Sequence, residues 1–311
     1  GDPAGVRIIS SGKTLVGKAK GFSKGDFGVE ASSLKGGSLV LTIDYRIQFL
    51  VEQLLAENIE RVEAKAGQVI VMDVRNGHVI AMADYPYYNP NQYFDHDYSV
   101  LKNSCVVDVL EPGSIFKLVT YAAALEEQVV TPGMVLEIPE SVVIQRRRIS
   151  EAHDREPGDP THYPAYEIIK QSMNVGTVML AEKMGKSTFY NYIEAFGFGS
   201  LTGIHLPGET RGLLRRLDDV SDIDNAVMSF GQGISVTPLQ MSAAVGAIAN
   251  MGVYVQPRII QHQTDHEHLR VANAGLYRQR RVVSSQTASQ VLAAMEQVVE
   301  SGTGRYAAVP G

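Results

Sequence analysis

The fold of this chain is decided by the stretch Glu111-Pro112-Gly113-Ser114-Ile115-Phe116-Lys117, which joins a Pro-Gly turn to a predicted apolar helix over residues 114–127. Residues three apart share one face of a helix, so Ser114 and Lys117 are predicted to lie one turn apart. A serine hydroxyl becomes a strong nucleophile when a nearby base takes its proton. A lysine is such a base when burial and the positive end of a helix lower its pKa. Ser114 is therefore a candidate nucleophile and Lys117 its candidate base.

The Ser-x-x-Lys spacing alone is not specific, because it occurs four times, at Ser10/Lys13, Ser32/Lys35, Ser99/Lys102 and Ser114/Lys117. The first two pairs lie in stretches rich in Gly and Lys, and the third follows a polar, aromatic loop. Only the pair at Ser114 combines a Pro-Gly entry with an apolar helix behind it. The alternative for Ser114 is the structural role of a helix N-cap, for which serine is also a preferred residue.

A second polar motif, Ser172-Met173-Asn174, is the only Ser-x-Asn sequence in the chain and lies between two predicted helices, 165–171 and 175–184. Its hydroxyl is suited to pass a proton to a leaving group, and its carboxamide is suited to hold a substrate amide. The alternative is a polar corner that joins two helices. In combination with a Ser-x-x-Lys helix, however, a Ser-x-Asn motif is typical of one class of serine acyl-transfer enzymes.

Together with residues 230–240, Phe-Gly-Gln-Gly-Ile-Ser-Val-Thr-Pro-Leu-Gln, the two motifs resemble the transpeptidase domain of class B penicillin-binding proteins of the FtsI and SpoVD type. Further stretches that fit the family in its order are residues 39–44 with Gln48, 71–74 with Gly77, 81–83, 85–86, 89–91, and 301–304 with Ala307, Ala308 and Pro310. The similarity begins near residue 35 and continues to the C-terminus, so it is more specific than any single motif.

The resemblance implies an α+β fold of the penicillin-binding-protein/serine β-lactamase-like transpeptidase type, with an antiparallel sheet packed with helices and an all-helical lobe. Residues 1–38 are expected to be the end of the non-catalytic pedestal domain and a linker, and residues 39–311 the transpeptidase domain. The family's third motif, Lys-Thr-Gly, is expected to follow Gly311, together with the C-terminal strands. Residues 301–304 have no cation at their first position and do not replace it. Acylation of this segment alone is therefore expected to be weak or absent.

The resemblance also implies a reaction, in which a serine attacks the penultimate D-Ala carbonyl of a peptidoglycan stem peptide and β-lactams acylate the same serine. Carried over residue by residue, it makes Ser114 the nucleophile, Lys117 its base, Ser172 a proton relay and Asn174 the residue that binds the donor's amide. It implies no cofactor and no metal. The implied partners are stem peptides, β-lactam antibiotics, a membrane-embedded glycan polymerase and divisome proteins.

The implied location is the extracytoplasmic face of the bacterial inner membrane, in the periplasm, with a role in septal wall synthesis. The family's N-terminal membrane anchor is expected to lie outside this chain, which is expected to be an excised soluble fragment. Two other functions stay open. A serine β-lactamase or a β-lactam sensor domain shares the Ser-x-x-Lys helix, although no match to a lactamase base motif is evident. A non-catalytic scaffold of wall synthesis would explain a missing Lys-Thr-Gly motif.

Composition excludes several other classes of protein. The 311 residues have a net charge of −6 and 44% hydrophobic content, which allows a sizeable core and gives no sign of a nucleic-acid-binding face. Cys105 is the only cysteine, so no intrachain disulfide is possible, and it is expected to be a small buried residue. His262 and His266 are spaced as metal ligands on a helix, but the residues between them give no apolar face, so a solvated loop is expected.

Local patterns predict further elements. A helix is expected over 45–60, capped by Asp44. Strands are expected over 68–74 and 78–83, joined by a type I′ turn at Asn76-Gly77, and a hairpin is expected over 135–149. Later helices are expected to begin at Ser187, at Thr237, and at either Ser284 or Ser285. The segment at Thr237 has the features of a capping box, with Pro238 at the first helical position.

Overall fold

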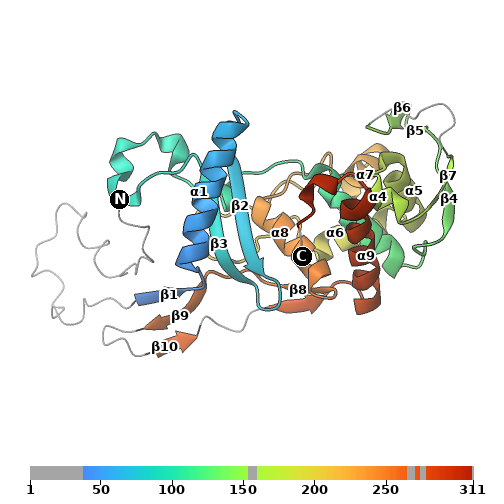
Figure 1. The fold of residues 1–311 in the computed structure, drawn as a ribbon. Coiled ribbons are helices and arrows are strands. Elements are labelled where there is room, and N and C mark those ends of the chain that lie inside the picture. Colours follow the sequence, from blue (N-terminus) through green and yellow to red (C-terminus); the bar gives the residue numbers. More distant parts are fainter. Residues whose placement is uncertain (1–37, 153–159, 265–269, 274–277, 310–311) are drawn as a thin grey trace, which may run out of the picture. The chain divides into compact units, whose positions relative to one another are not determined.

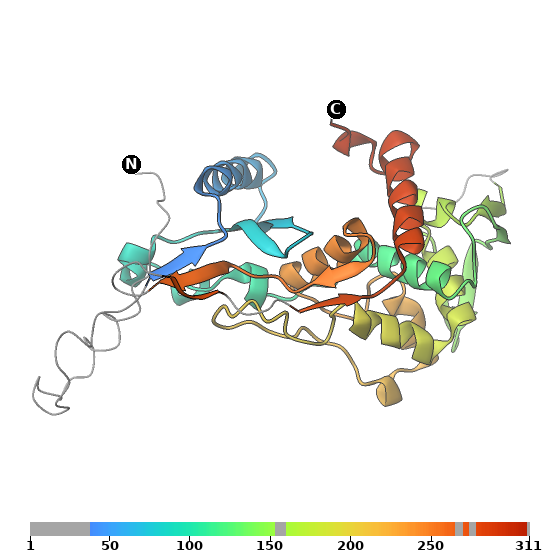
Figure 2. The ribbon, with the colours of Figure 1, turned by 90° about the horizontal axis from the view of Figure 1, so that it is seen from below.

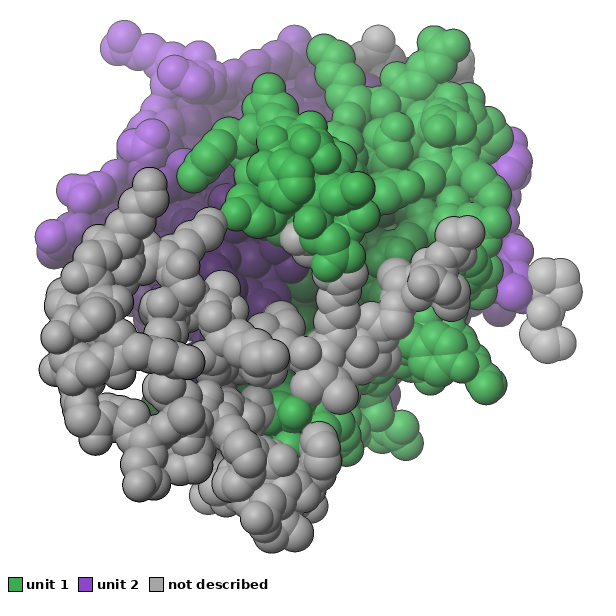
Figure 3. All heavy atoms as spheres, turned by 90° about the vertical axis from the view of Figure 1, so that its left-hand side faces the viewer, with its two compact units in different colours: residues 1–101, 256–278 green, residues 102–255, 279–311 purple. Residues whose placement is uncertain are grey.

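A computed structural model of the chain describes residues 38–152, 160–264, 270–273 and 278–309. The chain divides into two compact units, which are coloured separately in Figure 3: unit 1 comprises residues 1–101 and 256–278, and unit 2 comprises residues 102–255 and 279–311. The predicted pedestal segment consists almost entirely of residues 1–37, which lie outside the described residues.

Unit 1 combines one long helix with two small antiparallel sheets (Figure 1). One sheet is the hairpin of β2 (Gly67–Asp73) and β3 (His78–Tyr85); the other has the order β1 (Ser38–Leu41), β9 (Ile260–Thr264), β10 (Arg270–Asn273). Helix α1 (Tyr45–Arg61) packs on the hairpin, mainly against β3. The 3-10 turns η2 (Pro90–Asp95) and η3 (Tyr98–Val100) follow β3. The predicted helix and two strands are confirmed, with small shifts of their ends.

Side-chain hydrogen bonds fix the start of α1 and its position on β3. The Asp44 carboxylate accepts hydrogen bonds from the N–H groups of Arg46 and Ile47 at 2.9 and 3.3 Å, so Asp44 is the N-cap, as predicted. One turn later the Gln48 amide pairs with both backbone groups of Met82. It donates to the carbonyl oxygen at 2.9 Å and accepts from the N–H at 2.8 Å. The helix is thereby held in register with the strand beneath it.

Two predictions in unit 1 are wrong. Asp73 pairs directly with His78, so residues 74–77 form a longer loop in which Gly77, but not Asn76, has a positive φ. A type I′ turn needs positive φ at both central residues. The longer loop is organised by Asp73, whose carboxylate accepts hydrogen bonds from the side chains of Arg75 and Asn76. The predicted loop at His262 is a strand, β9, and His266 lies outside the described residues.

Unit 2 is mainly helical (Figures 1 and 2). It is organised around α3 (Lys117–Glu126), whose residues 119–125 are all buried. A helix that is apolar on all sides needs neighbours on all sides. Its neighbours are α4 (Glu167–Lys170), α5 (Asn174–Met184), α6 (Lys186–Ala195), α8 (Pro238–Ala249) and α9 (Ser285–Ser301). Helix α7 (Asp222–Met228) packs on α5, and α2 (Ser104–Val107) on α8. The α+β fold class is confirmed.

Short strands and 3-10 turns complete unit 2. The strand pairs are antiparallel: β4 (Val135–Glu137) with β7 (His162–Pro164), β5 (Ser141–Ile144) with β6 (Arg147–Ser150), and β8 (Val253–Val255) with β11 (Gln279–Arg281). The 3-10 turns are η4 (Gly113–Phe116), η5 (Leu217–Asp219) and η6 (Arg305–Ala307). The predicted hairpin over 135–149 is only partly right, because its first strand pairs with a distant one.

The helix starts in unit 2 test three predictions. Thr237 and Ser284 are the N-caps of α8 and α9, and Thr237 forms the predicted capping box with Gln240. The prediction for Ser187 is wrong, because α6 begins one residue earlier, directly after Gly185 with a φ of 80°. Cys105 is fully buried in α2, as expected. None of the helices within the described ranges has both the length and the apolar character of a membrane span.

Candidate active site

Ser114 lies in the 3-10 turn η4, which continues directly into α3. The Ser114 residue is exposed, whereas Phe116 and Lys117 behind it are buried. Pro112 and Phe116 occupy the cap positions of η4 and α3, and neither makes a side-chain capping bond. The N-cap alternative for Ser114 is therefore wrong, and its hydroxyl is not needed to begin the helix.

The segment that follows α7 holds the backbone on both sides of this turn. Gly113 donates its N–H to the carbonyl oxygen of Gly231 at 3.0 Å. In the opposite direction, the N–H of Gly233 donates to the Glu111 carboxylate at 2.8 Å. The motif Phe-Gly-Gln-Gly at 230–233 thus fixes the entry to Ser114 by direct hydrogen bonds. Glu111 belongs to the sequence motif, but its contact with a residue 122 positions later was not predicted.

Lys117 is buried, with only 2% of its surface exposed, and its Nζ atom points to the second motif. It donates to the carbonyl oxygen of Ser172 at 2.5 Å and to the Ser172 Oγ at 2.9 Å. Burial lowers the pKa of Lys117 from 10.5 to about 8, and the negative charge of Glu151 acts in the opposite direction. A lysine with this pKa has an accessible neutral form near neutral pH, which an exposed lysine does not have.

Ser172 occupies a tight turn between α4 and α5. Its φ of 57° is in the left-handed region, which is uncommon for a residue other than glycine. The turn directs both the carbonyl oxygen and the hydroxyl of Ser172 toward Lys117. Such backbone geometry is found where surrounding contacts hold a residue in place, often at functional sites. The motif does form a polar corner between two helices, and this corner faces the buried Lys117.

Asn174 is the first residue of α5 and is half-buried. Its side-chain Nδ2 donates to the carbonyl oxygen of Ser150, at the end of β6, at 3.2 Å. Its backbone N–H donates to the Glu151 carboxylate at 2.5 Å, and the N–H of Val175 donates to the same carboxylate at 3.2 Å. The motif is therefore held by residues 23 and 24 positions earlier in the chain.

All four predicted site residues lie in unit 2, at the start of α3 and at the start of α5. The structure brings Lys117 and Ser172 into direct contact although they are 55 residues apart. Glu151 was missed. The only sequence signal for it is a carboxylate just beyond a predicted strand, and nothing in the sequence indicates which helix it reaches. Among the described residues, no group of three His, Cys, Asp or Glu side chains is arranged to hold a metal ion.

Comparison with known proteins agrees with this geometry. Residues 67–311 match the family model described as the penicillin binding protein transpeptidase domain. The chain is 36% identical over 281 residues to stage V sporulation protein D of Bacillus subtilis, covering 89% of this chain and 43% of that protein. It is 34% identical over 218 residues to the peptidoglycan D,D-transpeptidase FtsI of Escherichia coli, covering 70% of this chain and 36% of that protein.

Solved structures give the same assignment. Penicillin-binding protein 3 of Mycobacterium tuberculosis, in its complex with aztreonam, matches with a TM-score of 0.84 and 34% identity, covering 89% of this chain and 63% of that one. The chain belongs to the penicillin-binding protein transpeptidase family, in the class B group of the FtsI and SpoVD type. Its fold is that of the penicillin-binding-protein/serine β-lactamase-like transpeptidase domains. The chain spans less than half the length of the curated relatives described here.

The close approach of Gly231 to the Ser114 turn predicts that Gly231→Ala is strongly destabilising. A Cβ atom at this position would lie 2.2 Å from the carbonyl oxygen of Gly113, and the φ of 80° is strained for alanine. The expected result is a loss of roughly 2 kcal/mol or more in the free energy of unfolding, measured by urea titration. Gly133→Ala is the matched control, because its Cβ would meet no atom within 4 Å. Equal stability of the two variants would contradict the described packing.

Proposed function

We propose that this chain carries the active site of a serine-type D-Ala-D-Ala transpeptidase, which cross-links peptidoglycan stem peptides during septal wall synthesis and is acylated by β-lactams. Ser114 is the nucleophile, Lys117 its base, Ser172 the proton relay and Asn174 the residue that binds the donor's amide. The observation that carries the proposal is the buried contact of Lys117 Nζ with the Ser172 Oγ at 2.9 Å. The names of FtsI and of the aztreonam complex support the substrate and the inhibitor class.

The exposed position of Ser114 suits its attack on a substrate carbonyl, and the burial of Lys117 suits its role as the base that takes the proton. The Ser114 Oγ gives its proton to the neutral form of Lys117 as the oxygen bonds to the penultimate D-Ala carbonyl carbon. The bond from this carbon to the nitrogen of the terminal D-Ala then breaks, and the leaving amine receives a proton through Ser172. The amine of a second stem peptide then bonds to the ester carbon and gives up a proton, the bond from this carbon to the Ser114 Oγ breaks, and the Oγ takes a proton back. This restores the starting state and leaves a new peptide bond.

The lowered pKa of Lys117 explains how a lysine serves as a base at neutral pH. With a pKa of about 8, roughly one tenth of the protein carries neutral Lys117 at pH 7. An unperturbed lysine would be neutral in fewer than about one molecule in a thousand. Burial therefore raises the population of the reactive form by roughly two orders of magnitude.

The family membership supports a wider biological proposal. We assign residues 39–311 to the transpeptidase domain and place it on the extracytoplasmic face of the inner membrane, attached by the N-terminal membrane anchor of the family. A membrane-embedded glycan polymerase and the division proteins are the proposed partners, because cross-linking acts on newly polymerised glycan. The chemistry requires no cofactor, since positioned hydrogen-bond donors and one base are sufficient for serine acyl transfer.

The role of Ser114 is tested with a fluorescent penicillin and the full-length gene product. We expect Ser114→Ala to abolish the covalent adduct completely, because no other group replaces its oxygen. Ser99→Ala is the control, since Ser99 belongs to one of the other Ser-x-x-Lys sequences. Peptide mass spectrometry locates the adduct. An adduct on the Ser114→Ala protein would contradict the proposal, and rapid repeated turnover of nitrocefin by the wild type would indicate a β-lactamase instead.

The role of Lys117 as base predicts the pH dependence of acylation. The neutral form reacts, so the second-order rate constant is expected to rise about tenfold per pH unit below pH 8 and to level off above it. The measurement is stopped-flow acylation between pH 6 and 9.5, with circular dichroism at each pH to verify folding. A rate that is flat over this range, or that still rises tenfold per pH unit at pH 9.5, would exclude the proposed base.

A further inference from the structure

We propose that Glu151 is a positioning residue of the reaction, which holds the Asn174 end of the Ser172-Met173-Asn174 motif through backbone N–H groups and so keeps Ser172 in contact with Lys117. The inference rests on the proposed function of these residues. It concerns a side chain that contacts the backbone of the motif and, in this arrangement, no reacting atom.

The Glu151 carboxylate spans the start of α5. One oxygen accepts the N–H of Asn174 at 2.5 Å and the other accepts the N–H of Val175 at 3.2 Å. Met173, which occupies the N-cap position of α5, makes no side-chain capping bond. The first N–H groups of a helix have no partner within the helix, so Glu151 supplies the cap that the local sequence lacks. Its negative charge also interacts favourably with the positive end of the helix.

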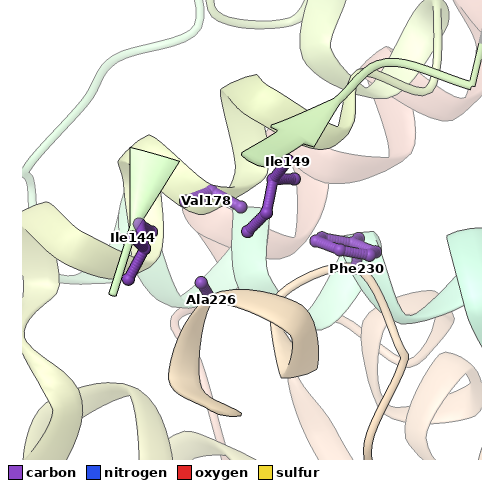
Figure 4. Close-up of a cluster of buried hydrophobic side chains, with 5 residues drawn as sticks. All are labelled: Ile144, Ile149, Val178, Ala226 and Phe230. Carbon is purple, nitrogen blue, oxygen red and sulfur yellow. The ribbon is translucent and has the colours of Figure 1, made fainter. Parts of the chain in front are cut away.

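Glu151 is itself held on a fixed element. It follows β6, and the β5–β6 hairpin packs on α5 and on the end of α7 through the buried side chains of Ile144, Ile149, Val178, Ala226 and Phe230. Figure 4 shows these five side chains facing a common interior between the hairpin and the two helical segments. Two residues beyond Ile149, the carboxylate reaches the first turn of α5. The packing of the β5–β6 hairpin and the cap from Glu151 thus both hold the start of α5.

The turn is consequently held at both ends. On one side Lys117 binds the carbonyl and hydroxyl oxygens of Ser172, and on the other side Glu151 binds the N–H groups of Asn174 and Val175. Ser172 itself has a φ of 57°, which needs support from its surroundings. Loss of the Glu151 contacts would free one end of the turn and loosen the distance between Lys117 and Ser172.

A carboxylate at this position also acts on Lys117 by its charge. Among the described residues, Glu151 is the charged group whose charge affects the pKa of Lys117. Glu167 on α4 bonds Lys170 and Gln171, and Glu126 at the far end of α3 accepts the N–H of Ser284. Glu151 raises the pKa of Lys117 and so opposes part of the effect of burial. Its removal would move the pKa further down.

The test compares Glu151→Gln and Glu151→Asp with the wild-type full-length gene product. Glu140→Gln is the matched control, because Glu140 is an exposed carboxylate beside the same hairpin. Two quantities are measured: the acylation rate constant for a fluorescent penicillin as a function of pH, and the amide hydrogen exchange rates of Asn174 and Val175. The shorter aspartate keeps the charge, so it provides the conservative variant if the glutamine variant folds poorly.

We expect Glu151→Gln to lower the high-pH limit of the acylation rate about tenfold or more, because small displacements of reacting groups have large effects on rate. The pH at half of that limit is expected to move below 8, which a purely structural role would not produce. Exchange at Asn174 and Val175 is expected to accelerate about tenfold. For the rate limit and the exchange rates, Glu151→Asp is expected to lie between Glu151→Gln and the wild type. Glu140→Gln is expected to equal the wild type in both.

An unchanged pH profile in Glu151→Gln, or unchanged exchange at Asn174 and Val175, would overturn the proposal. A lower acylation rate in Glu151→Gln with the same midpoint pH would also overturn it, because that result would indicate a loss of stability alone. If the wild type forms no adduct at Ser114, the proposed function is wrong. The exchange rates still decide whether Glu151 holds the start of α5, so the two failures are distinguishable.

Discussion

The arrangement of the site depends on one buried contact, the hydrogen bonds from Lys117 Nζ to the carbonyl oxygen and hydroxyl of Ser172. An ammonium group that is removed from water is costly unless nearby acceptors replace the lost hydration. Here both acceptors are neutral, so they satisfy hydrogen bonds without a compensating charge. The lowered pKa of Lys117 is the direct consequence. The contact therefore links the packing of two helices to the protonation state of the proposed base.

Much of unit 2 serves to keep this contact in place. Helix α3, whose residues 119–125 are buried, fixes Lys117 at its first turn, and the 230–233 segment fixes the 3-10 turn that carries Ser114. The hairpin β5–β6 and Glu151 fix the first turn of α5, from which the Ser172 turn leads back to Lys117. Each of the two turns that carry the proposed site is thus held by a carboxylate that accepts backbone N–H groups: Glu111 beside the Ser114 turn and Glu151 beside the Ser172 turn.

Local signals in the sequence predicted the elements that carry the site but not the contacts between them. Asp44, Thr237 and Ser284 mark helix starts because a cap acts within three residues of its own position. The pairing of Lys117 with Ser172 was expected from the family motifs, since 55 residues separate the two and no local pattern joins them. Glu151 and the strand partner of β4 escaped prediction for the same reason: long-range partners are chosen by packing, which periodicity does not specify. At residues 74–77 the conformation of the loop follows from hydrogen bonds to the Asp73 carboxylate and not from the Asn-Gly dipeptide.

The central claim, that burial against Ser172 makes Lys117 a base near neutral pH, is tested most directly by titrating its side-chain nitrogen. Lysine labelled with ¹⁵N at Nζ gives a resonance for each lysine, and the signal of Lys117 is identified by its loss in Lys117→Arg. The predicted result is a midpoint near pH 8 for that signal, well below the exposed lysines. A midpoint near 10.5 would show that Lys117 remains a fully charged ammonium, and the proposed mechanism would then be wrong.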